Sequence, residues 1–548
     1  MPYPLLILAK SRRPRTPEGT LNYTYDLAGN VASIYSSSLH GASMSYTYDS
    51  LNRLSTVVDN NLPAGSNTTI YAYDTASNLV TVTDPNQLQS TIQYDSLNRL
   101  TSLNTAMPNS SAVAGYSYTL GATGNRTGAT EQNSRTLTWN YDGIYRLTSE
   151  AVSADPSGGN GEVDYTLDPV GNRTSANSSL PGVQSVTLNS FNLDDWLSPE
   201  TYDANGNTLT TGGKTFAYDS ENHLVSMNGG AVTMIYDGFG NRVAKKVGNV
   251  TTTYLVEDGV NPTGLPQVFE ESVNGVLQRT YTYGLQRISE NQQINGTWTP
   301  SFYGYDGGGS VRQLTDLNGI VTDNYNYDAF GNLLSSPGPT PNNYLYRGEQ
   351  FDSDLNLYYL RARYYNPQTG RFLSRDPEDG KSTDPKTLHK YLYAGGDPVN
   401  SVDPSGRGMY EYGLMIGRFV AQVGPALAAL TSGAVAMADE MSEVVPEILD
   451  DVTEALEDLA DAAADAAEGL AAAAEELMDA AEDLIETAVD QYNGLVEAAE
   501  KGGPIIKLLT CAALTGIGSD IIGVAPEKYK LRFAIGGHLA CHTILFSH

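Results

Sequence analysis

A four-residue motif, Tyr-x-Tyr-Asp, recurs along most of the chain and constrains its fold more than any other feature. It appears as YTYDLAGNV at 23, YTYDSLNRL at 46, YAYDTASNL at 71 and YNYDAFGNLL at 325, with variants between them. In the first six copies the second tyrosine lies at 25, 48, 73, 94, 118 and 141, so one repeat takes 21 to 25 residues. A period in the low twenties is typical of one β-hairpin per repeat.

The residue types of the motif predict how each hairpin is built. The two tyrosines are two positions apart, so they share one face of an extended strand, where tyrosines of neighbouring repeats can stack. The aspartate can accept hydrogen bonds from backbone N–H groups two residues on, and the following Gly or Asn can adopt the left-handed conformation of a tight turn. Side by side, such hairpins form an antiparallel sheet that must curl or close to protect its edges.

The aromatic composition also predicts a mainly β fold. The chain has 36 Tyr against 11 Phe and 3 Trp, together with 54 Gly, which is typical of many strands and turns. We expect a poorly ordered segment at 1–20 and the repeats at 21–343. The N-terminus lacks the order of a secretory signal, because its apolar run precedes its basic residues. Since the repeats begin almost at once, we expect the chain to be the C-terminal part of a longer protein.

The segment that follows the repeats is the densest in aromatic, Arg and Asp residues. It contains LNLYYLRARYYNPQTGRFLSRDP from 355 to 377 and YLYAGGDPVNSVDPSG from 391 to 406. These runs resemble the core that closes the YD-repeat (Rhs) shell of bacterial Rhs polymorphic toxins, of insecticidal toxin complex C components and of teneurins. The resemblance implies that the repeat sheet coils spirally into a hollow shell, here a partial one, which residues 344–407 close.

The same resemblance implies a function in delivery. A shell of this kind encapsulates or presents a variable C-terminal tail, and it is secreted or lies at the cell surface. Its partners are then its own tail and secretion-system or target-cell surface proteins, and no cofactor is implied. Two alternatives remain: an aspartyl peptidase that cuts itself and releases the tail as an effector, and a shell whose tail anchors in or acts on a membrane.

The candidate catalytic residues come from the resemblance. Family members that cut themselves use an Arg in Ala-Arg-Tyr-Tyr and the aspartates of two Asp-Pro pairs, and these positions match Arg363, Asp376 and Asp403. Two carboxylates held close share one proton, so one can act as acid while the other activates water. From the residues alone, Asp-Pro is an ordinary turn dipeptide, and the chain has seven of them.

The expected cut lies near Arg407. In the family an apolar residue precedes the cleaved bond, and that position holds Arg407 in the run Asp-Pro-Ser-Gly-Arg-Gly-Met. A charged side chain in an apolar pocket costs several kcal/mol unless it finds a partner. The sequence therefore predicts that the pair is intact but its substrate is poor, and that Arg407→Leu raises cleavage.

The tail, residues 408–548, is predicted to be helical. An apolar helix is expected at 413–438, as a buried helix, a plug inside the shell or a membrane contact. An acidic Ala-rich helix is expected at 439–500, and a small apolar end at 502–548. Leu449, Leu456, Leu470, Leu477 and Leu484 recur at multiples of seven, which predicts packing against another helix.

Charge and cysteine usage exclude several other functions. The net charge is −31, and most of it lies in the acidic helix, so the chain lacks the excess of Lys and Arg that binds nucleic acid broadly. Two cysteines do not make a disulfide framework. His538, Cys541 and His542 form a weak metal pattern, and we predict no metal site. No triad, phosphate loop or basic patch identifies an effector enzyme in the tail.

Overall fold

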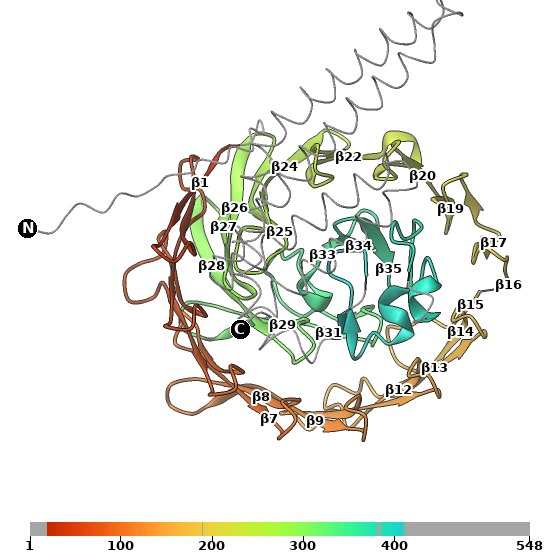
Figure 1. Cartoon of the computed structure of the whole chain (residues 1–548), viewed down its shortest axis with the longest axis horizontal. Helices are drawn as coiled ribbons and strands as arrows, with labels where there is room; N and C mark the ends of the chain where they lie inside the picture. The colour runs from red at the N-terminus through yellow and green to blue at the C-terminus, as the bar shows by residue number, and fades with distance from the viewer. Residues whose placement is uncertain (1–18, 189, 381–384, 409, 412–548) are drawn as a thin grey trace, which may run out of the picture. The chain divides into compact units, whose positions relative to one another are not determined.

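The computed structural model describes most of the first three quarters of the chain, namely residues 19–188, 190–380, 385–408 and 410–411. All of these belong to the first of two compact units, Met1–Ala426 and Leu427–His548. They consist almost entirely of antiparallel strands, which confirms the predicted β fold (Figure 1).

The predicted features of the tail lie outside the described residues. This holds for both helices, for the small apolar end and for the His and Cys residues near the C-terminus. None of the helices in the described part of the chain has the length and apolar character needed to span a membrane. The division into repeats, closing segment and tail stays a prediction.

Two long sheets contain most of the strands, each hydrogen-bonded to the next in chain order. The first consists of β1 (Leu21–Tyr25), β2 (Val31–Ser36), β3 (Ser43–Tyr48), β4 (Leu54–Asp59), β5 (Thr68–Tyr73), β6 (Leu79–Thr83), β7 (Gln89–Tyr94), β8 (Leu100–Ala106), β9 (Ala112–Leu120), β10 (Arg126–Glu131), β11 (Thr136–Tyr141), β12 (Leu147–Ser153), β13 (Gly161–Leu167), β14 (Arg173–Ser178) and β15 (Val186–Thr187). The second consists of β18 (Thr201–Tyr202), β19 (Thr208–Thr211), β20 (Lys214–Tyr218), β21 (Leu224–Met227), β22 (Val232–Tyr236), β23 (Arg242–Val247), β24 (Val250–Asp258), β25 (Pro266–Val273), β26 (Val276–Tyr283), β27 (Arg287–Ile294), β28 (Thr297–Tyr305), β29 (Val311–Thr315) and β30 (Val321–Asn324).

Short elements connect and close these sheets. The small sheets are the pairs β16 (Ser190–Phe191) with β17 (Leu197–Ser198), β31 (Asn326–Tyr327) with β32 (Leu333–Ser335) and β37 (Ser401–Val402) with β38 (Tyr410–Glu411), and the four strands β33 (Gln350–Asp352), β34 (Leu357–Leu360), β35 (Arg363–Asn366) and β36 (Arg371–Phe372). The 3-10 helices are η1 (Asn228–Gly230), η2 (Tyr346–Gly348), η3 (Pro385–Leu388) and η4 (Tyr393–Gly396).

The turns of the repeats form as the motif predicts. In the turn after β3, Oδ1 of Asp49 accepts hydrogen bonds from the N–H groups of Leu51 at 2.9 Å and Arg53 at 3.0 Å. Asn52 between them has φ 58°, in the left-handed region. The same two bonds are made by Asp26, Asp74, Asp95, Asp142, Asp168, Asp203, Asp219, Asp237, Asp306, Asp316 and Asp328. The aspartate thus ends each strand by satisfying backbone donors of its own turn.

Neighbouring repeats are linked by the second tyrosine of the motif. The hydroxyl of Tyr73 donates to the carbonyl oxygen of Leu54 at 2.8 Å, and that of Tyr94 donates to Leu79 at 3.0 Å. Equivalent bonds are made by Tyr48, Tyr141, Tyr236, Tyr283, Tyr305 and Tyr327. Each acceptor lies at or near the start of a strand in the preceding repeat, so a hydrogen bond links these neighbouring repeats, and at Tyr283 the ring also stacks on Phe269.

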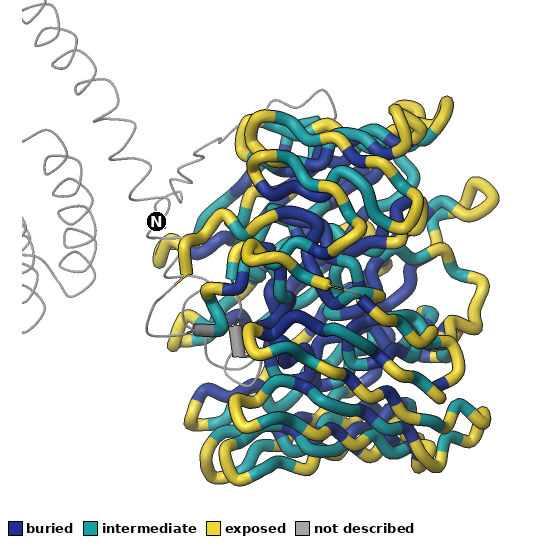
Figure 2. Tube along the Cα trace, turned by 90° about the vertical axis from the view of Figure 1, so that its right-hand side faces the viewer, coloured by how far each residue is buried: buried dark blue, intermediate teal, exposed yellow. Residues whose placement is uncertain are grey.

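The later strands of the second long sheet, β24 to β28, lie on the inner side of the first strands of the first sheet, whereas β19, β20 and β22 continue its outer ring (Figure 1). Buried polar contacts join the two: Tyr23 donates to Glu257 at 3.1 Å, and Arg312 pairs with Glu131 at 2.9 Å. Buried and half-buried residues alternate along most strands of the two sheets, while the turns at their ends are exposed (Figure 2). Residues that are far apart in sequence therefore enclose a common core of tyrosine, leucine and paired charges.

Arg242 of β23 makes several buried contacts with the sheet β33–β36. The guanidinium of Arg242 donates to Asp352 at 2.9 Å, to Tyr364 at 2.8 Å and to Gln350 at 2.7 Å. Its carbon lies 4.4 Å from the ring centre of Tyr359. The side chains of both Arg242 and Asp352 are 1% exposed, so the pair is fully withdrawn from water.

The buried carboxyl of Glu290 in β27 contributes more to the stability of the shell at low pH than at high pH. Burial raises the pKa of Glu290 from 4.5 to about 8, although Arg279 and a hydrogen bond from Tyr303 oppose this effect. In the unfolded chain Glu290 loses its proton at its ordinary pKa, whereas in the folded shell it keeps the proton. Its contribution to stability is therefore present below pH 4.5 and falls as the pH rises to about 8.

We expect Glu290→Gln to remove this loss. The amide is neutral at every pH, so the variant gains stability over the wild type by about 1–3 kcal/mol at about pH 8.5, and by much less at about pH 5. Urea unfolding of both chains at the two pH values measures the difference. The acidic residues of the tail titrate equally in both proteins, so their contribution cancels from the stability difference. An equal stability difference at both pH values would contradict the expectation.

Candidate functional site

The structure brings Arg363, Asp376 and Asp403 into direct contact. Arg363 is the first residue of β35, Asp376 follows β36, and Asp403 follows β37. One terminal nitrogen of Arg363 lies 2.7 Å from Oδ2 of Asp376 and 3.1 Å from Oδ2 of Asp403. Both carboxylates therefore contact the same nitrogen atom and are close neighbours.

The remaining donors of Arg363 fix its orientation. Its Nε donates to the carbonyl oxygen of Gly406, and its other terminal nitrogen donates to the carbonyl oxygen of Lys390 at 3.2 Å. The guanidinium carbon lies 3.6 Å from the ring centre of Phe372, which supports it from one side. A planar guanidinium with every nitrogen engaged holds the two carboxylates in a defined geometry.

The electrostatics of the group favour one shared proton. Burial raises the pKa of Asp376, and burial together with the charge of Asp376 raises that of Asp403, while Arg363 lowers both. Burial also lowers the pKa of Arg363. One positive charge cannot compensate two buried negative charges, whereas one ionised and one protonated carboxyl leave the group neutral.

Asp403 also binds the backbone at the expected cut. Its Oδ1 accepts hydrogen bonds from the N–H groups of Arg407 and Gly408, each at 3.1 Å. The nitrogen of Gly408 is the amine that leaves when the Arg407–Gly408 bond is hydrolysed. A protonated Asp403 in this place can donate its proton to that nitrogen, and Asp376 is the remaining carboxylate that can activate water.

The loop that carries this bond is held tightly. Gly406 has φ 68°, and a Cβ on it would lie 2.4 Å from the carbonyl oxygen of Leu360. The N–H of Ala362 donates to the carbonyl oxygen of Ser405 at 3.2 Å. After the loop, β38 pairs with β37, with Ser401 opposite Glu411. The glycine is therefore required by both conformation and space.

Arg407 does not enter an apolar pocket. Its side chain is 58% exposed, and its guanidinium lies 4.0 Å from a carboxylate oxygen of Glu378, which is itself exposed. The expected cost of a stranded charge is therefore absent, because the arginine keeps its contact with water. The physical reason for expecting Arg407→Leu to raise cleavage is removed with it.

Sequence reasoning missed the supporting residues of the site. Phe372, Lys390 and Gly406 hold Arg363, two of them through backbone atoms that carry no sequence signal. Only Gly406 had a recognisable signal, since it ends a Pro-Ser-Gly run that favours a turn. In the described part of the chain no group of His, Cys, Asp and Glu has the arrangement of a metal site.

The comparisons with known proteins identify the family of the repeat region. The family described as Teneurin YD-shell matches residues 15–147 and 122–399. The tRNA3(Ser)-specific nuclease WapA of Bacillus spizizenii is 35% identical over 237 residues, which cover 40% of this chain and 10% of that protein. The toxin protein Tse5 of Pseudomonas aeruginosa is 31% identical over 107 residues, 19% of this chain and 8% of that protein. The chain thus spans a small part of these relatives.

Solved structures show the same fold. The Tc holotoxin pore of Photorhabdus luminescens has a TM-score of 0.59 and 20% identity, and covers 71% of this chain and 21% of that one. The TcdB2-TccC3-Cdc42 structure has a TM-score of 0.58 and 19% identity, with 74% and 22% covered. The family match extends over most of the chain, from the first repeats to the closing segment that carries Arg363 and Asp376. On this evidence the chain belongs to the teneurin YD-shell family and is a Rhs-like shell protein.

Proposed function

We propose that the chain is a delivery shell that encapsulates or presents its own C-terminal tail, and that it cuts itself between Arg407 and Gly408. The family supports the first part, because its relatives include toxin proteins. A single observation carries the second part: Arg363 bridges two buried aspartates, and one of these accepts the N–H of the bond to be cut.

The proposed reaction needs no cofactor. Asp376, ionised beside Arg363, takes a proton from a water molecule that attacks the carbonyl carbon of Arg407. Asp403 then gives its proton to the nitrogen of Gly408, and the C–N bond breaks. The products are a carboxyl group on Arg407 and an amine on Gly408; the carboxyl proton passes to solvent, and the proton that Asp376 took from water replaces on the pair the one that Asp403 gave away.

The proposed setting follows the resemblance to secreted toxins. The shell acts outside the cell that makes it, at the cell surface or after secretion, and its partners are surface proteins of the producing or the target cell. In this proposal the tail, residues 408–548, is what the shell carries. A membrane contact of residues 413–438 remains a second role for that tail.

Intact-mass spectrometry of the expressed full chain tests the cleavage. We expect the 58.8 kDa chain to convert into two fragments whose masses sum to that of the chain plus one water. The new N-terminus should be Gly408, and conversion should be faster at about pH 6 than at about pH 9, because the acid form of the pair is needed. A single uncut mass after long incubation at both pH values would show that the two aspartates serve only as turn formers.

A further inference from the structure

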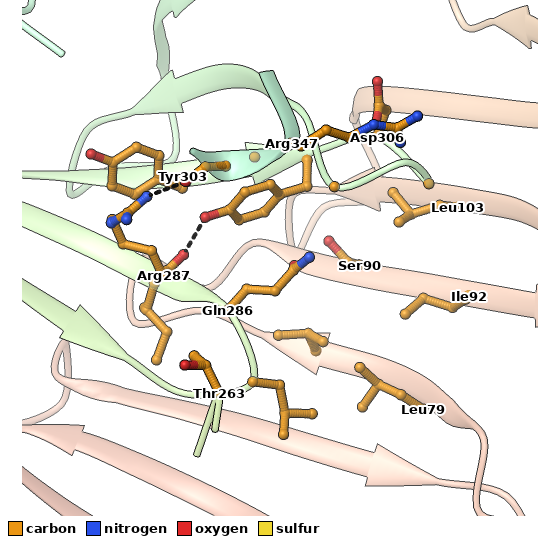
Figure 3. Close-up of a pocket in the computed structure, with 18 of the residues that line it drawn as sticks. Leu79, Ser90, Ile92, Leu103, Thr263, Gln286, Arg287, Tyr303, Asp306 and Arg347 are labelled. Carbon is orange, nitrogen blue, oxygen red and sulfur yellow. Dashed lines mark hydrogen bonds between the residues drawn. The ribbon is translucent and has the colours of Figure 1, made fainter. Parts of the chain in front are cut away.

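A cavity of about 240 Å³ lies between the two long sheets. Leu79, Ile92 and Leu103 line it from successive strands of the first sheet (Figure 3). Leu285 and Ile288 line it from the start of β27. Its volume is just below the range of about 300–1,000 Å³ that is typical of small-molecule sites, and like those sites its walls are mostly apolar with a few polar groups.

One of those polar groups, Asp84, is placed unlike the other turn aspartates. It begins the turn between β6 and β7, in which the N–H of Asp84 donates to Leu88 at 2.8 Å. Twelve aspartates of the repeats satisfy their carboxylates within such turns, but here Asn86 replaces the aspartate and accepts the N–H of Leu88 at 3.3 Å. The carboxylate of Asp84 is left without a hydrogen bond or ion pair among the described residues, and it lines the cavity.

The other charged side chains of the cavity already have partners. Arg361 pairs with Glu349 at 2.9 Å, and Asp403 is held by Arg363. Asp306 accepts backbone N–H groups of its own turn. Arg126, Arg287 and Arg347 donate to backbone carbonyl oxygens. None of these groups neutralises Asp84.

The uncompensated carboxylate is costly to the folded chain. Burial alone raises the pKa of Asp84 from 3.8 to about 7. A positive group placed beside it removes this cost, because a buried charge is tolerated when it is paired. A negative ligand would add repulsion, and a neutral apolar ligand would leave the carboxylate unpaired and drier than before.

We propose that this cavity binds a small amphiphile with an apolar body and a single cationic amine head, the amine pairing with Asp84 and the body lying against the leucines. The apolar walls and the single unpaired carboxylate select these two features together. Asp403 also lines this cavity, so the site shares one wall with the proposed cleavage site, but the amine pairs with Asp84 and takes no part in the cleavage.

Calorimetric titration of the full chain with octylamine, octanol and octanoate tests the proposal. The three probes share one apolar body and differ in the charge of the head. We expect octylamine to bind about tenfold or more tightly than octanol, and octanoate more weakly than both. Asp84→Asn should reduce the preference for octylamine over octanol to about onefold.

The controls separate the charge from the cavity. Asp74→Asn removes a turn aspartate outside the cavity and should leave the preference unchanged, which excludes a general loss of negative charge. Leu103→Trp fills the cavity and should weaken all three probes at least tenfold, with Asp84 still present. The proposal is overturned if octylamine and octanol bind equally to the wild type, if Asp84→Asn keeps the preference, or if no probe binds.

Discussion

Asp403→Asn is expected to slow cleavage at Arg407–Gly408 by about 100- to 10,000-fold, the range of one lost proton donor. The asparagine keeps the size of the side chain and can still occupy the loop, but it has no proton to give to the nitrogen of Gly408. Asp376→Asn should be equally slow, since it cannot activate water. Appearance of the Gly408 fragment, followed by mass spectrometry over several days, measures both rates.

A matched control lies in the same closing segment. Asp397 also precedes a proline, is buried, and accepts two hydrogen bonds from the side chain of Asn400 at 2.9 and 3.0 Å. Asp397→Asn should cut at the wild-type rate. If the wild type is cut and Asp403→Asn is cut equally fast while folded, Asp403 has no part in the reaction.

Arg242→Met is expected to destabilise the folded shell by about 3 kcal/mol, at the lower end of the range for breaking a buried ion pair. Methionine fills much of the space, so the loss comes from Asp352, Gln350 and Tyr364, which lose their donor in a dry interior. Lys245 remains 2.9 Å from Asp352 and limits the cost. Urea unfolding, followed by the β signal of far-UV circular dichroism, measures the difference.

Two further variants distinguish charge from volume. Arg242→Met combined with Asp352→Leu should recover most of the stability, because it removes the stranded carboxylate as well as its partner. Arg53→Met breaks a pair with Asp49 whose carboxylate is 27% exposed, and should cost less than about 1 kcal/mol. Equal losses from Arg242→Met and Arg53→Met would show that Arg242 is not required for packing the closing sheet.

The sequence predicted those parts of the fold that depend on hydrogen bonds between residues close together in the chain. Asp49 and its eleven equivalents make their hydrogen bonds within five residues, so the motif alone predicts the turns, the strands and a continuous antiparallel sheet. Contacts between Tyr23 and Glu257, or between Arg312 and Glu131, join residues that no spacing relates. The packing of the later strands of the second sheet inside the first, and the cavity between them, could therefore not be predicted.

The candidate site shows the same limit. Arg363, Asp376 and Asp403 were chosen by resemblance, because among seven Asp-Pro pairs the residues alone give no reason to prefer two. Their contact through one guanidinium nitrogen depends on how β35, β36 and β37 meet. The environment of Arg407 was wrongly predicted, since exposure is decided by the fold around a side chain. In the sequence Asp84 resembles the other turn aspartates, and only the structure shows that Asn86 accepts the backbone hydrogen bond from Leu88 in its place.

Because β37 pairs with β38, hydrolysis of the Arg407–Gly408 bond and dissociation of the tail are two separate events. The bond between Arg407 and Gly408 lies in the loop between these strands, so hydrolysis opens the loop but leaves both new ends in register, Val402 opposite Tyr410 and Ser401 opposite Glu411. The two fragments would then stay associated until a force separates β37 from β38. In that case release of the tail requires a force that separates the two strands, and hydrolysis at Asp403 only makes this separation possible.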